Sequence, residues 1–483
     1  MKTLLYIVFT FSLAVVFWGC QDDFLTDAAQ PLDRFGGNDF YDSPDKIQSG
    51  VNAIYFELYD LYARPNLLFA YVNISDNGAQ DNTETDVTNT FGKRLVDGDV
   101  ANASNNIWQI SYKIISKSNI IEDAIETGFP DFQGDPALSR SMGEARFMRA
   151  YAYLTLVTIF GDVPLLLDQP VTIEEASALT RNPVSSVWEQ AIIPDLEYAA
   201  ENCWVKSQLV TEGLLGSAPQ AAAKLALAEA YLFNDRPGEA EAVLEEVVAS
   251  GEYSLLPDFS ALWGGNDNNA ESIFEIQFNF GETGRANDYT RLLPFELQGI
   301  GGFQFTTQIS VPTDDLVNAM EGDTRFLATL DTGLYDIDSI FVEANHWRKY
   351  TDFSIGAGAI ENDWNINLMR YADVLHLLAE AEIRQDKVAE GMAHVNETRA
   401  RASMPLFSAS VSQSEALDLY LEERRLEFAG EMKRWRDLLR TEKTVEVIEE
   451  FLGTSIPESQ LLWPIPEGEI EANPDGIFQN PGY

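Results

Sequence analysis

The sequence predicts a mostly α-helical protein, in which antiparallel helical hairpins form one scaffold with long irregular loops and a few short strands. Apolar residues recur every three and four positions over several long segments, which is the period of an amphipathic helix. Two of these segments are interrupted by a short polar turn and therefore read as helix–turn–helix pairs. Two long stretches, at about 63–106 and 253–366, lack this period and are predicted to be loop insertions.

The first twenty residues are predicted to be an export signal rather than part of the fold. Lys2 supplies a positive start, and an uncharged apolar run follows from Leu4 to Trp18. This run is shorter than the roughly 20 residues that a membrane-spanning helix needs. It ends in Gly19-Cys20, which resembles a lipobox, so that 1–19 would be removed and Cys20 acylated. Ordinary secretion with an incidental cysteine is the alternative.

Capping residues and spacing predict the helices of the first half. Ser43-Pro44-Asp45 is typical of an N-cap followed by a proline in the first turn. Apolar residues then recur at helical spacing as far as Tyr62. The same spacing predicts helices over 107–127, over 136–160 and over 183–202.

Two helical hairpins are predicted further along, at 219–250 and, less clearly, at 370–402. Their residue offsets match the tetratricopeptide pattern, with small residues where two helices cross and bulky ones that fill the gap. Any antiparallel helix pair is the alternative. The matching positions are Leu227, Ala228, Tyr231, Ala240 and Leu244 in the first hairpin, and Leu378, Ala379, Gly391 and Val395 in the second.

Composition excludes several classes of function. The 483 residues carry a net charge of −45, which repels nucleic-acid phosphates and anionic head groups. Cys20 and Cys203 are the two cysteines, so no disulfide framework is expected, and Cys203 is predicted to be a structural thiol. The three histidines lack the spacing of a zinc site. Asp-rich 76–99 lacks EF-hand spacing, so no cofactor is expected, although a structural calcium ion stays an alternative.

Charged residues at helical spacing raise the question of catalysis or anion binding. The block from Glu422 to Asp437 alternates basic and acidic side chains, and we expect an ion-paired helix rather than an anion site. Asp373, Glu380 and Glu382 resemble the paired carboxylates of a glycosidase, but apolar residues interleave with them at helix-pairing positions. The sequence has no nucleophile elbow and no phosphate-binding loop. We therefore predict no catalytic residue.

Five blocks, in order along nearly the whole chain, resemble the SusD/RagB family of outer-membrane lipoproteins that capture glycans or peptides. They are CQDDFL from Cys20, GEARFMRAYAYLTLVTIFGDVP from Gly143, MRYADVLHLLAEAE from Met369, EERRLEFAGEMKRWRDLL from Glu422, and the closing LWPIPEGEIEANPDGIFQNPGY. Residues 253–366 resemble the family only generally.

The resemblance implies a signal peptide at 1–19 and a single right-handed helical domain over 20–483. It further implies a non-catalytic lipoprotein of the outer membrane, exposed at the cell surface and anchored through Cys20. Such a protein would capture oligosaccharides and deliver them to a TonB-dependent, SusC-like transporter. A peptide-capturing, RagB-like protein is the alternative, and a helical glycosidase or a scaffold that binds only proteins is less favoured.

The ligand is expected on a face where the loop 71–106 and the insertion 280–366 converge, since such loops form the site in the family. Aromatic rings would pack on the apolar faces of sugars, and polar side chains would hydrogen-bond to their edges. The same chemistry suits peptides. The candidate ligand-binding residues are Asp76, Asn77, Phe91, Arg94, Tyr289, Arg291, Phe303, Phe305 and Trp364.

Overall fold

The computed structural model describes residues 40–483 apart from several internal stretches. These stretches are 64–65, 80–97, 169–171, 173–174, 176–177, 280–285, 288, 290–294, 301–309, 351–362 and 458–460. The predicted signal sequence and Cys20 therefore lie outside the described residues. None of the helices in the described part of the chain is both long enough and apolar enough to span a bilayer.

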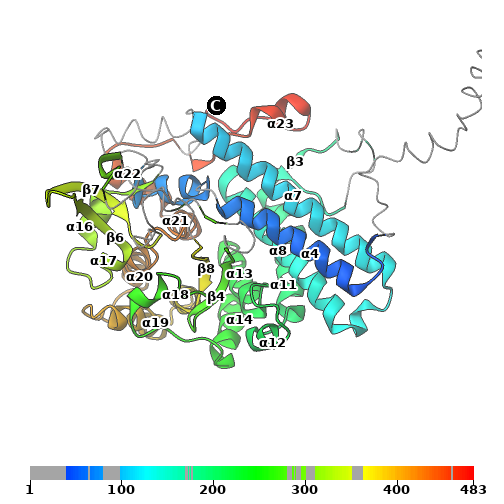
Figure 1. Cartoon of the computed structure of the whole chain (residues 1–483), viewed down its shortest axis with the longest axis horizontal. Coiled ribbons are helices and arrows are strands. Elements are labelled where there is room, and N and C mark those ends of the chain that lie inside the picture. The colour runs from blue at the N-terminus through cyan, green and yellow to red at the C-terminus, as the bar shows by residue number, and fades with distance from the viewer. Residues whose placement is uncertain are drawn as a thin grey trace, which may run out of the picture.

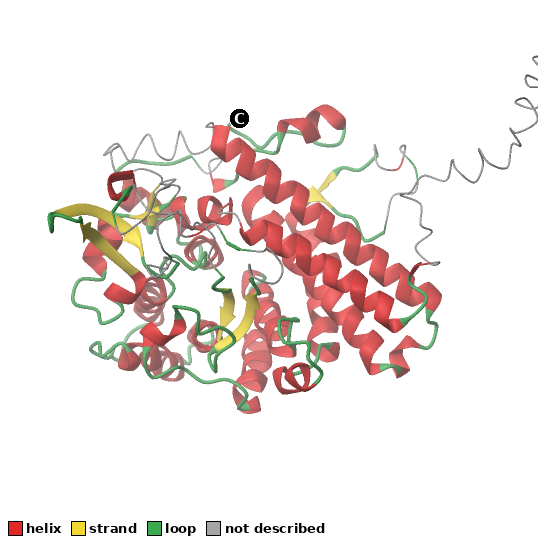
Figure 2. Cartoon of the chain, viewed as in Figure 1, coloured by secondary structure: helices red, strands yellow, loops and turns green. Residues whose placement is uncertain are grey.

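Eight helices form a continuous array in which each packs against the next along the chain (Figure 1). Figure 2 shows how far helices outweigh strands, which confirms the predicted fold class. The eight are α4 (Pro44–Ala63), α7 (Gly98–Gly128), α8 (Pro136–Phe160), α11 (Ile193–Asn202), α13 (Gln220–Phe233), α14 (Pro237–Ser250), α18 (Tyr371–Arg384) and α19 (Val388–Arg401).

Shorter helices connect and flank this array. They include α5 (Asn66–Leu68), a π-helix over Phe69–Asn73, α10 (Val184–Val187), a second π-helix over Trp188–Ile192, α12 (Lys206–Thr211), α16 (Asp314–Ala319), α17 (Phe326–Thr329), α20 (Gln413–Glu427), α21 (Arg434–Arg440), α22 (Thr444–Leu452) and α23 (Glu467–Ala472). Single 3₁₀ turns lie at Phe132–Gly134, Phe259–Leu262 and Phe295–Leu297.

Both ends of α8 lie where the helix over 136–160 was predicted to begin and end. The carboxylate of Asp135 caps its first turn by accepting hydrogen bonds from the backbone N–H groups of Ala137 and Leu138. At the other end Gly161 has a φ of 74°, a conformation that a residue with a side chain rarely adopts. Capping residue and glycine therefore fix both ends of the helix at the predicted positions.

The two predicted hairpins are confirmed, as α13 with α14 and α18 with α19. Ala228 and Ala240 of the first hairpin are completely buried, as small residues at a helix crossing should be. In the second, a Cβ added to Gly391 would lie 2.7 Å from the carbonyl oxygen of Ala379. The helices therefore approach so closely here that glycine is the residue that fits.

The predicted insertion at 63–106 is too long, because α7 already begins at Gly98. Residues 98–106 are rich in Gly, Asp and Asn, which have low helix propensity, so their sequence gave no helical signal. Tertiary contacts overcome this preference: Ala103 is buried, and the Ser104 hydroxyl donates to the carbonyl oxygen of Pro464 at 2.8 Å.

The strands form four antiparallel two-stranded sheets within the described residues. One pair joins β4 (Ser272–Ile276) to β8 (Ile366–Arg370). The other pairs are β1 (Gly78–Ala79) with β5 (Val311–Pro312), β2 (Val163–Pro164) with β3 (Arg181–Asn182), and β6 (Leu330–Tyr335) with β7 (Phe341–Trp347). The insertion 253–366 is thus partly regular.

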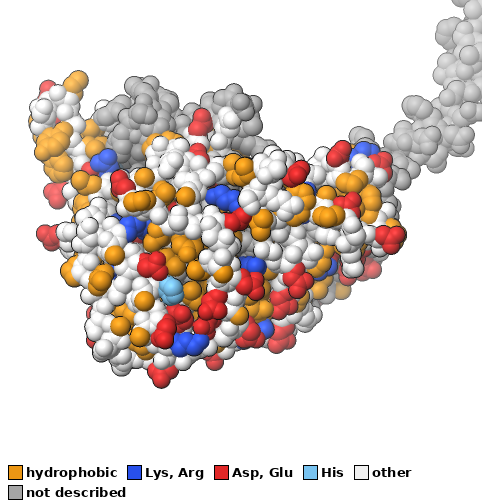
Figure 3. Space-filling view, turned by 90° about the horizontal axis from the view of Figure 1, so that it is seen from below, with side chains coloured by type: hydrophobic (Ala, Val, Ile, Leu, Met, Phe, Trp, Pro, Cys, Tyr) orange, Lys and Arg blue, Asp and Glu red, His pale blue; other side chains and the backbone are white. Residues whose placement is uncertain are grey.

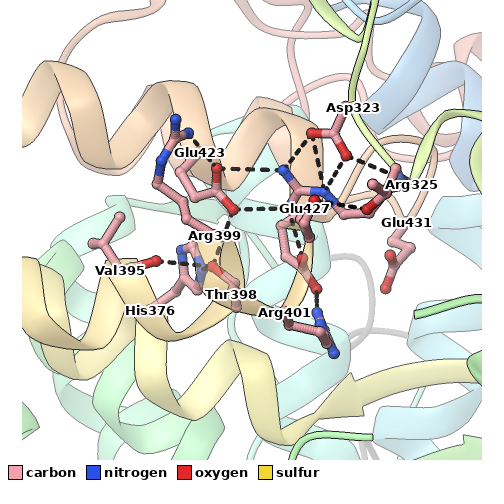
Figure 4. Close-up of polar contacts among 12 residues, drawn as sticks. Asp323, Arg325, His376, Val395, Thr398, Arg399, Arg401, Glu423, Glu427 and Glu431 are labelled. Carbon is pink, nitrogen blue, oxygen red and sulfur yellow. Dashed lines mark hydrogen bonds and ion pairs between the residues drawn. The ribbon is translucent and has the colours of Figure 1, made fainter. Parts of the chain in front are cut away.

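A buried network of ion pairs joins α20 to its surroundings (Figure 4). Glu427 lies at its centre and contacts Arg325, Arg370 and Arg401, and none of these four side chains is more than 4% exposed. Neighbouring pairs extend it, namely Arg325 with Asp323 and Glu423, Arg399 with Glu423, and Glu431 with Arg370 and Lys349. The charged block from Glu422 is therefore an ion-paired structural element, as predicted.

Candidate functional site

A two-stranded ladder joins the two segments that were expected to carry the ligand site. Gly78 and Ala79 of β1 pair with Pro312 and Val311 of β5. The pairing continues through Thr313, whose backbone N–H donates to the carbonyl oxygen of Asn77 at 3.1 Å. The predicted convergence of 71–106 with 280–366 is thereby confirmed at this ladder.

Asp76 and Asn77 directly precede β1 in the chain, and two arginines hold them in place. The Asp76 carboxylate accepts hydrogen bonds from the Arg434 guanidinium at 2.8 and 2.9 Å, and the Asn77 side-chain oxygen accepts one from Arg425 at 2.8 Å. Both residues are almost fully buried. These bonds fix the start of the loop to the helices. That Asp76 and Asn77 also contact a ligand stays a prediction. Such a contact would require the bonds to the two arginines to open.

The negative charge of Asp76 is compensated by the positive charges of Arg425 and Arg434. Burial alone would raise the pKa of Asp76, but the nearby guanidinium groups of Arg434 and Arg425 hold it below its usual value. Arg425 also reaches Asp315 of α16 at 2.6 Å, so one side chain binds both converging segments. The ladder is therefore fixed to α20 and α21, from which the two arginines come.

Tyr289 and Trp364 lie together in a second part of the site. The side-chain amide of Asn287 donates to the carbonyl oxygen of Trp364 at 2.8 Å, and its oxygen accepts from the backbone N–H of Tyr289 at 3.1 Å. Tyr289 is fully buried and meets the ring of Tyr350 edge-on at 5.0 Å. Trp364 is partly exposed. Of the two, Trp364 is the better placed to meet a ligand.

A small cavity, which we call the aromatic pocket, lies beside these residues and is lined chiefly by Trp263, Asp267, Lys349, Tyr350 and Trp364. Its volume of about 20 Å³ suits a group the size of a water molecule. An oligosaccharide is far larger, so this pocket by itself does not hold one.

Burial shifts the pKa values of Lys349 and Asp267, two of the charged groups that line the aromatic pocket. It lowers the pKa of Lys349 to about 8 against the opposing effect of Glu431, whose carboxylate lies 2.6 Å from the ammonium nitrogen. For Asp267, burial and then the charge of Glu275 raise the pKa to about 6. Lys349 and Asp267 provide hydrogen-bonding groups in the pocket, and the aromatic residues that line it provide ring faces.

Two of the three carboxylates that resembled a glycosidase pair have arginine or lysine partners. Arg440 and Arg384 hold Glu380 at 2.7 and 2.6 Å, and although burial opposes ionisation, they lower its pKa to about 2. Asp373 is buried and paired with Arg424 and Lys433. The expected structural role of these two residues is confirmed. In the described part of the chain, no group of three or more His, Cys, Asp or Glu side chains is arranged to hold a metal ion.

Five of the nine candidate ligand-binding residues lie outside the described residues, namely Phe91, Arg94, Arg291, Phe303 and Phe305. Four of them belong to stretches that adjoin the ladder in the chain, since 80–97 follows directly after Ala79 of β1 and 301–309 directly precedes Ser310 and β5. Sequence reasoning missed the supporting role of Arg425 and Arg434. Both lie in the charged block, but nothing in its spacing indicates a partner in a distant loop. Cys203 is buried, as predicted.

Comparisons with known proteins agree with this architecture. A model of the SusD family matches residues 342–483, and a model described as starch-binding associating with outer membrane matches residues 28–231. SusD-like protein P2 of Formosa agariphila is 28% identical over 419 residues, which is 78% of this chain and 80% of that protein.

Solved structures share the fold. A SusD superfamily protein from Parabacteroides distasonis superimposes with a TM-score of 0.79 at 25% identity, over 91% of this chain and 99% of that one. Surface glycan-binding protein A from Bacteroides thetaiotaomicron, solved in complex with laminarihexaose, gives 0.73 at 19% identity, over 90% of this chain and 99% of that one. At the lower identity the likeness concerns the fold alone. Together, the two family models on different parts of the chain and the relatives along most of its length show that this protein belongs to the SusD/RagB family.

Proposed function

We propose that this protein is a non-catalytic lipoprotein of the cell surface, which captures oligosaccharides and delivers them to a TonB-dependent, SusC-like transporter in the outer membrane. The observation that carries the proposal is the β1–β5 ladder, because it joins the two segments 71–106 and 280–366, which contain the candidate aromatic and polar ligand-binding residues. The glycan-binding relative that shares the fold supports the same ligand class.

The chemistry of the described residues supports capture rather than catalysis. Ring faces and amide groups bind sugars without activating a water molecule or a nucleophile. Of the three carboxylates that resembled a glycosidase pair, Asp373 and Glu380 are buried in ion pairs, and a carboxylate oxygen of Glu382 lies 3.7 Å from a ring nitrogen of His394. A peptide ligand uses similar contacts and is the second candidate.

Capture without cleavage is the expected result for the soluble chain that lacks residues 1–20. Calorimetric titration with laminarihexaose and with malto-, xylo- and manno-oligosaccharides should give saturable binding to one of these classes. A reducing-sugar assay on the same mixtures should show no new chain ends. Release of reducing ends would contradict the proposal. Binding of a peptide pool, with no binding of any of the glycans, would instead identify peptides as the ligand class.

The lipid anchor is tested by replacing Cys20 with Ala. Acylation needs the sulfur of this residue, so the variant should move from the membrane fraction to the soluble fraction when cells are lysed. Fractionation followed by immunoblotting measures the shift, and Cys203→Ala is the matched control because that thiol is buried in the fold. In a strain without the transporter, membrane attachment of the Cys20 variant would show that another anchor exists.

A further inference from the structure

The hairpin of β6 and β7 carries an apolar tip at one edge of the molecule. Figure 1 places the two strands away from the helical array, and Figure 3 shows hydrophobic side chains gathered on the projection at the same edge. The apolar tip consists of Tyr335, Ile337, Ile340 and Phe341, which are 70%, 99%, 60% and 45% exposed. Contiguous exposed apolar side chains on a folded protein mark an interaction surface.

Local hydrogen bonds and a ring contact support the turn that carries the apolar tip. The Asp336 carboxylate accepts hydrogen bonds from the backbone N–H groups of Asp338 and Ile340 at 2.9 and 2.8 Å, which fixes the turn on both sides of Ile337. Tyr335 and Phe341 pair across the strands with ring centroids 5.2 Å apart. A surface that is already ordered loses little conformational entropy when a partner binds it.

The root of the hairpin is anchored to the candidate ligand site. The indole N–H of Trp347 donates to the hydroxyl of Ser310 at 3.2 Å, and Asn345 donates to the carboxylate of Asp314 at 2.8 Å. Ser310 and Asp314 flank β5, one strand of the ladder described above. A partner that binds the apolar tip would therefore lie beside the loops that are proposed to hold the ligand.

Charge restricts what can bind the apolar tip. Asp336 and Asp338 alternate with its residues in the chain, Glu343 follows in β7, and no lysine or arginine occurs between Arg325 and Arg348. An anionic membrane surface would repel these carboxylates, and membrane-binding segments usually carry basic residues instead. A second copy of the chain would bring like charges together, with −45 on each molecule. The complementary surface is an apolar hollow with lysine or arginine at its rim, on a different protein.

We propose that the apolar tip docks in such a hollow on the extracellular face of the transporter, an inference that rests on the proposed function. The apolar residues would supply the buried centre of the contact, while Asp338 and Glu343 would meet basic residues at its rim. Docking there would place the β1–β5 ladder next to the entrance through which the ligand must pass.

The test is co-purification with an affinity-tagged transporter from the same uptake system, expressed together with this protein. Changing Ile337 and Ile340 to Ser should reduce the recovered protein at least about tenfold, as expected when the apolar centre of an interface is lost. Leu406→Ser is the matched control, because Leu406 is 61% exposed in the segment between α19 and α20, and its recovery should equal that of the native chain. Asp338→Lys should weaken recovery at low salt by removing the rim attraction.

Equal recovery of the native chain and the Ile337/Ile340 variant would overturn the docking proposal, as would failure of the native chain to co-purify. Flotation of the soluble chain with anionic vesicles, or its dimerisation in sedimentation experiments, would also overturn the proposal if either is lost in the same variant. Calorimetric glycan binding by the soluble variant is measured separately and should match the native chain. Capture and docking can therefore fail independently.

Discussion

Glu427→Ala is expected to lower the free energy of unfolding by about 3–5 kcal/mol, the usual effect of removing one partner from a buried ion pair. Its carboxylate contacts Arg370 at 2.5 Å, Arg325 at 2.8 Å and Arg401 as well. Without it, three buried guanidinium groups lose a counter-charge and cannot reach water. Burial would raise the pKa of Glu427, yet Arg401, Arg370 and Arg325 hold it well below its usual value. The three guanidinium groups therefore stabilise the ionised form of this carboxylate.

Urea unfolding followed by circular dichroism measures the effect. Glu446→Ala is the matched control: Glu446 pairs with Lys443 at 3.0 Å, but its side chain is 66% exposed, and surface pairs contribute about 0–1 kcal/mol. Equal unfolding midpoints for the two variants would show that the network does not stabilise the fold.

Replacing Phe91, Phe303 and Phe305 together with Ala should weaken glycan binding at least about a hundredfold. A ring stacked on a ligand contributes about 1–3 kcal/mol, by analogy with bases stacked on aromatic side chains, and about 1.4 kcal/mol corresponds to tenfold in affinity. Phe91 lies on the segment that follows β1, and Phe303 and Phe305 lie on the segment that precedes β5. Tyr289 is left unchanged because it is fully buried, and its loss would disturb packing.

The oligosaccharide identified by the capture experiment is the probe, and calorimetry gives the dissociation constant. Phe478→Ala removes an equally large ring that is 59% exposed near the C-terminus, and it should leave binding unchanged. Melting temperatures should be similar for both variants. Native affinity in the triple variant would place the ligand elsewhere, and Trp364 beside the aromatic pocket would then be the next residue to change.

The sequence was most informative where local rules decide the structure. Asp135 and Gly161 set the ends of α8, and the turn before Pro237 separates α13 from α14. Gly391 indicates a helix crossing because a larger side chain at this position would collide with the facing helix. In each case the determining contact lies within one helix or one hairpin, so the pattern is visible in a short stretch of residues.

Long-range contacts explain what the sequence did not reveal. The β1–β5 strands are two residues each and more than 200 positions apart, so no local periodicity indicates their pairing. Asp76 was predicted to face a ligand from its loop context, but its position is set by Arg434, 358 residues later. The β6–β7 hairpin lies in a segment whose composition resembles a loop, and its apolar residues were not singled out.

The ion-pair network also bears on how the chain reaches its native state. Arg325 meets Glu427 across 102 residues and Arg370 meets it across 57, so no helix or hairpin forming on its own can neutralise these charges. Bringing such distant residues together carries a loop-closure entropy that must be overcome before the ion pairs form. The region from Glu271 to Glu431 should therefore assemble as one late, cooperative unit. A chain that ends within it would leave buried arginines without counter-charges, so C-terminal shortening should abolish folding of this half rather than gradually weaken it.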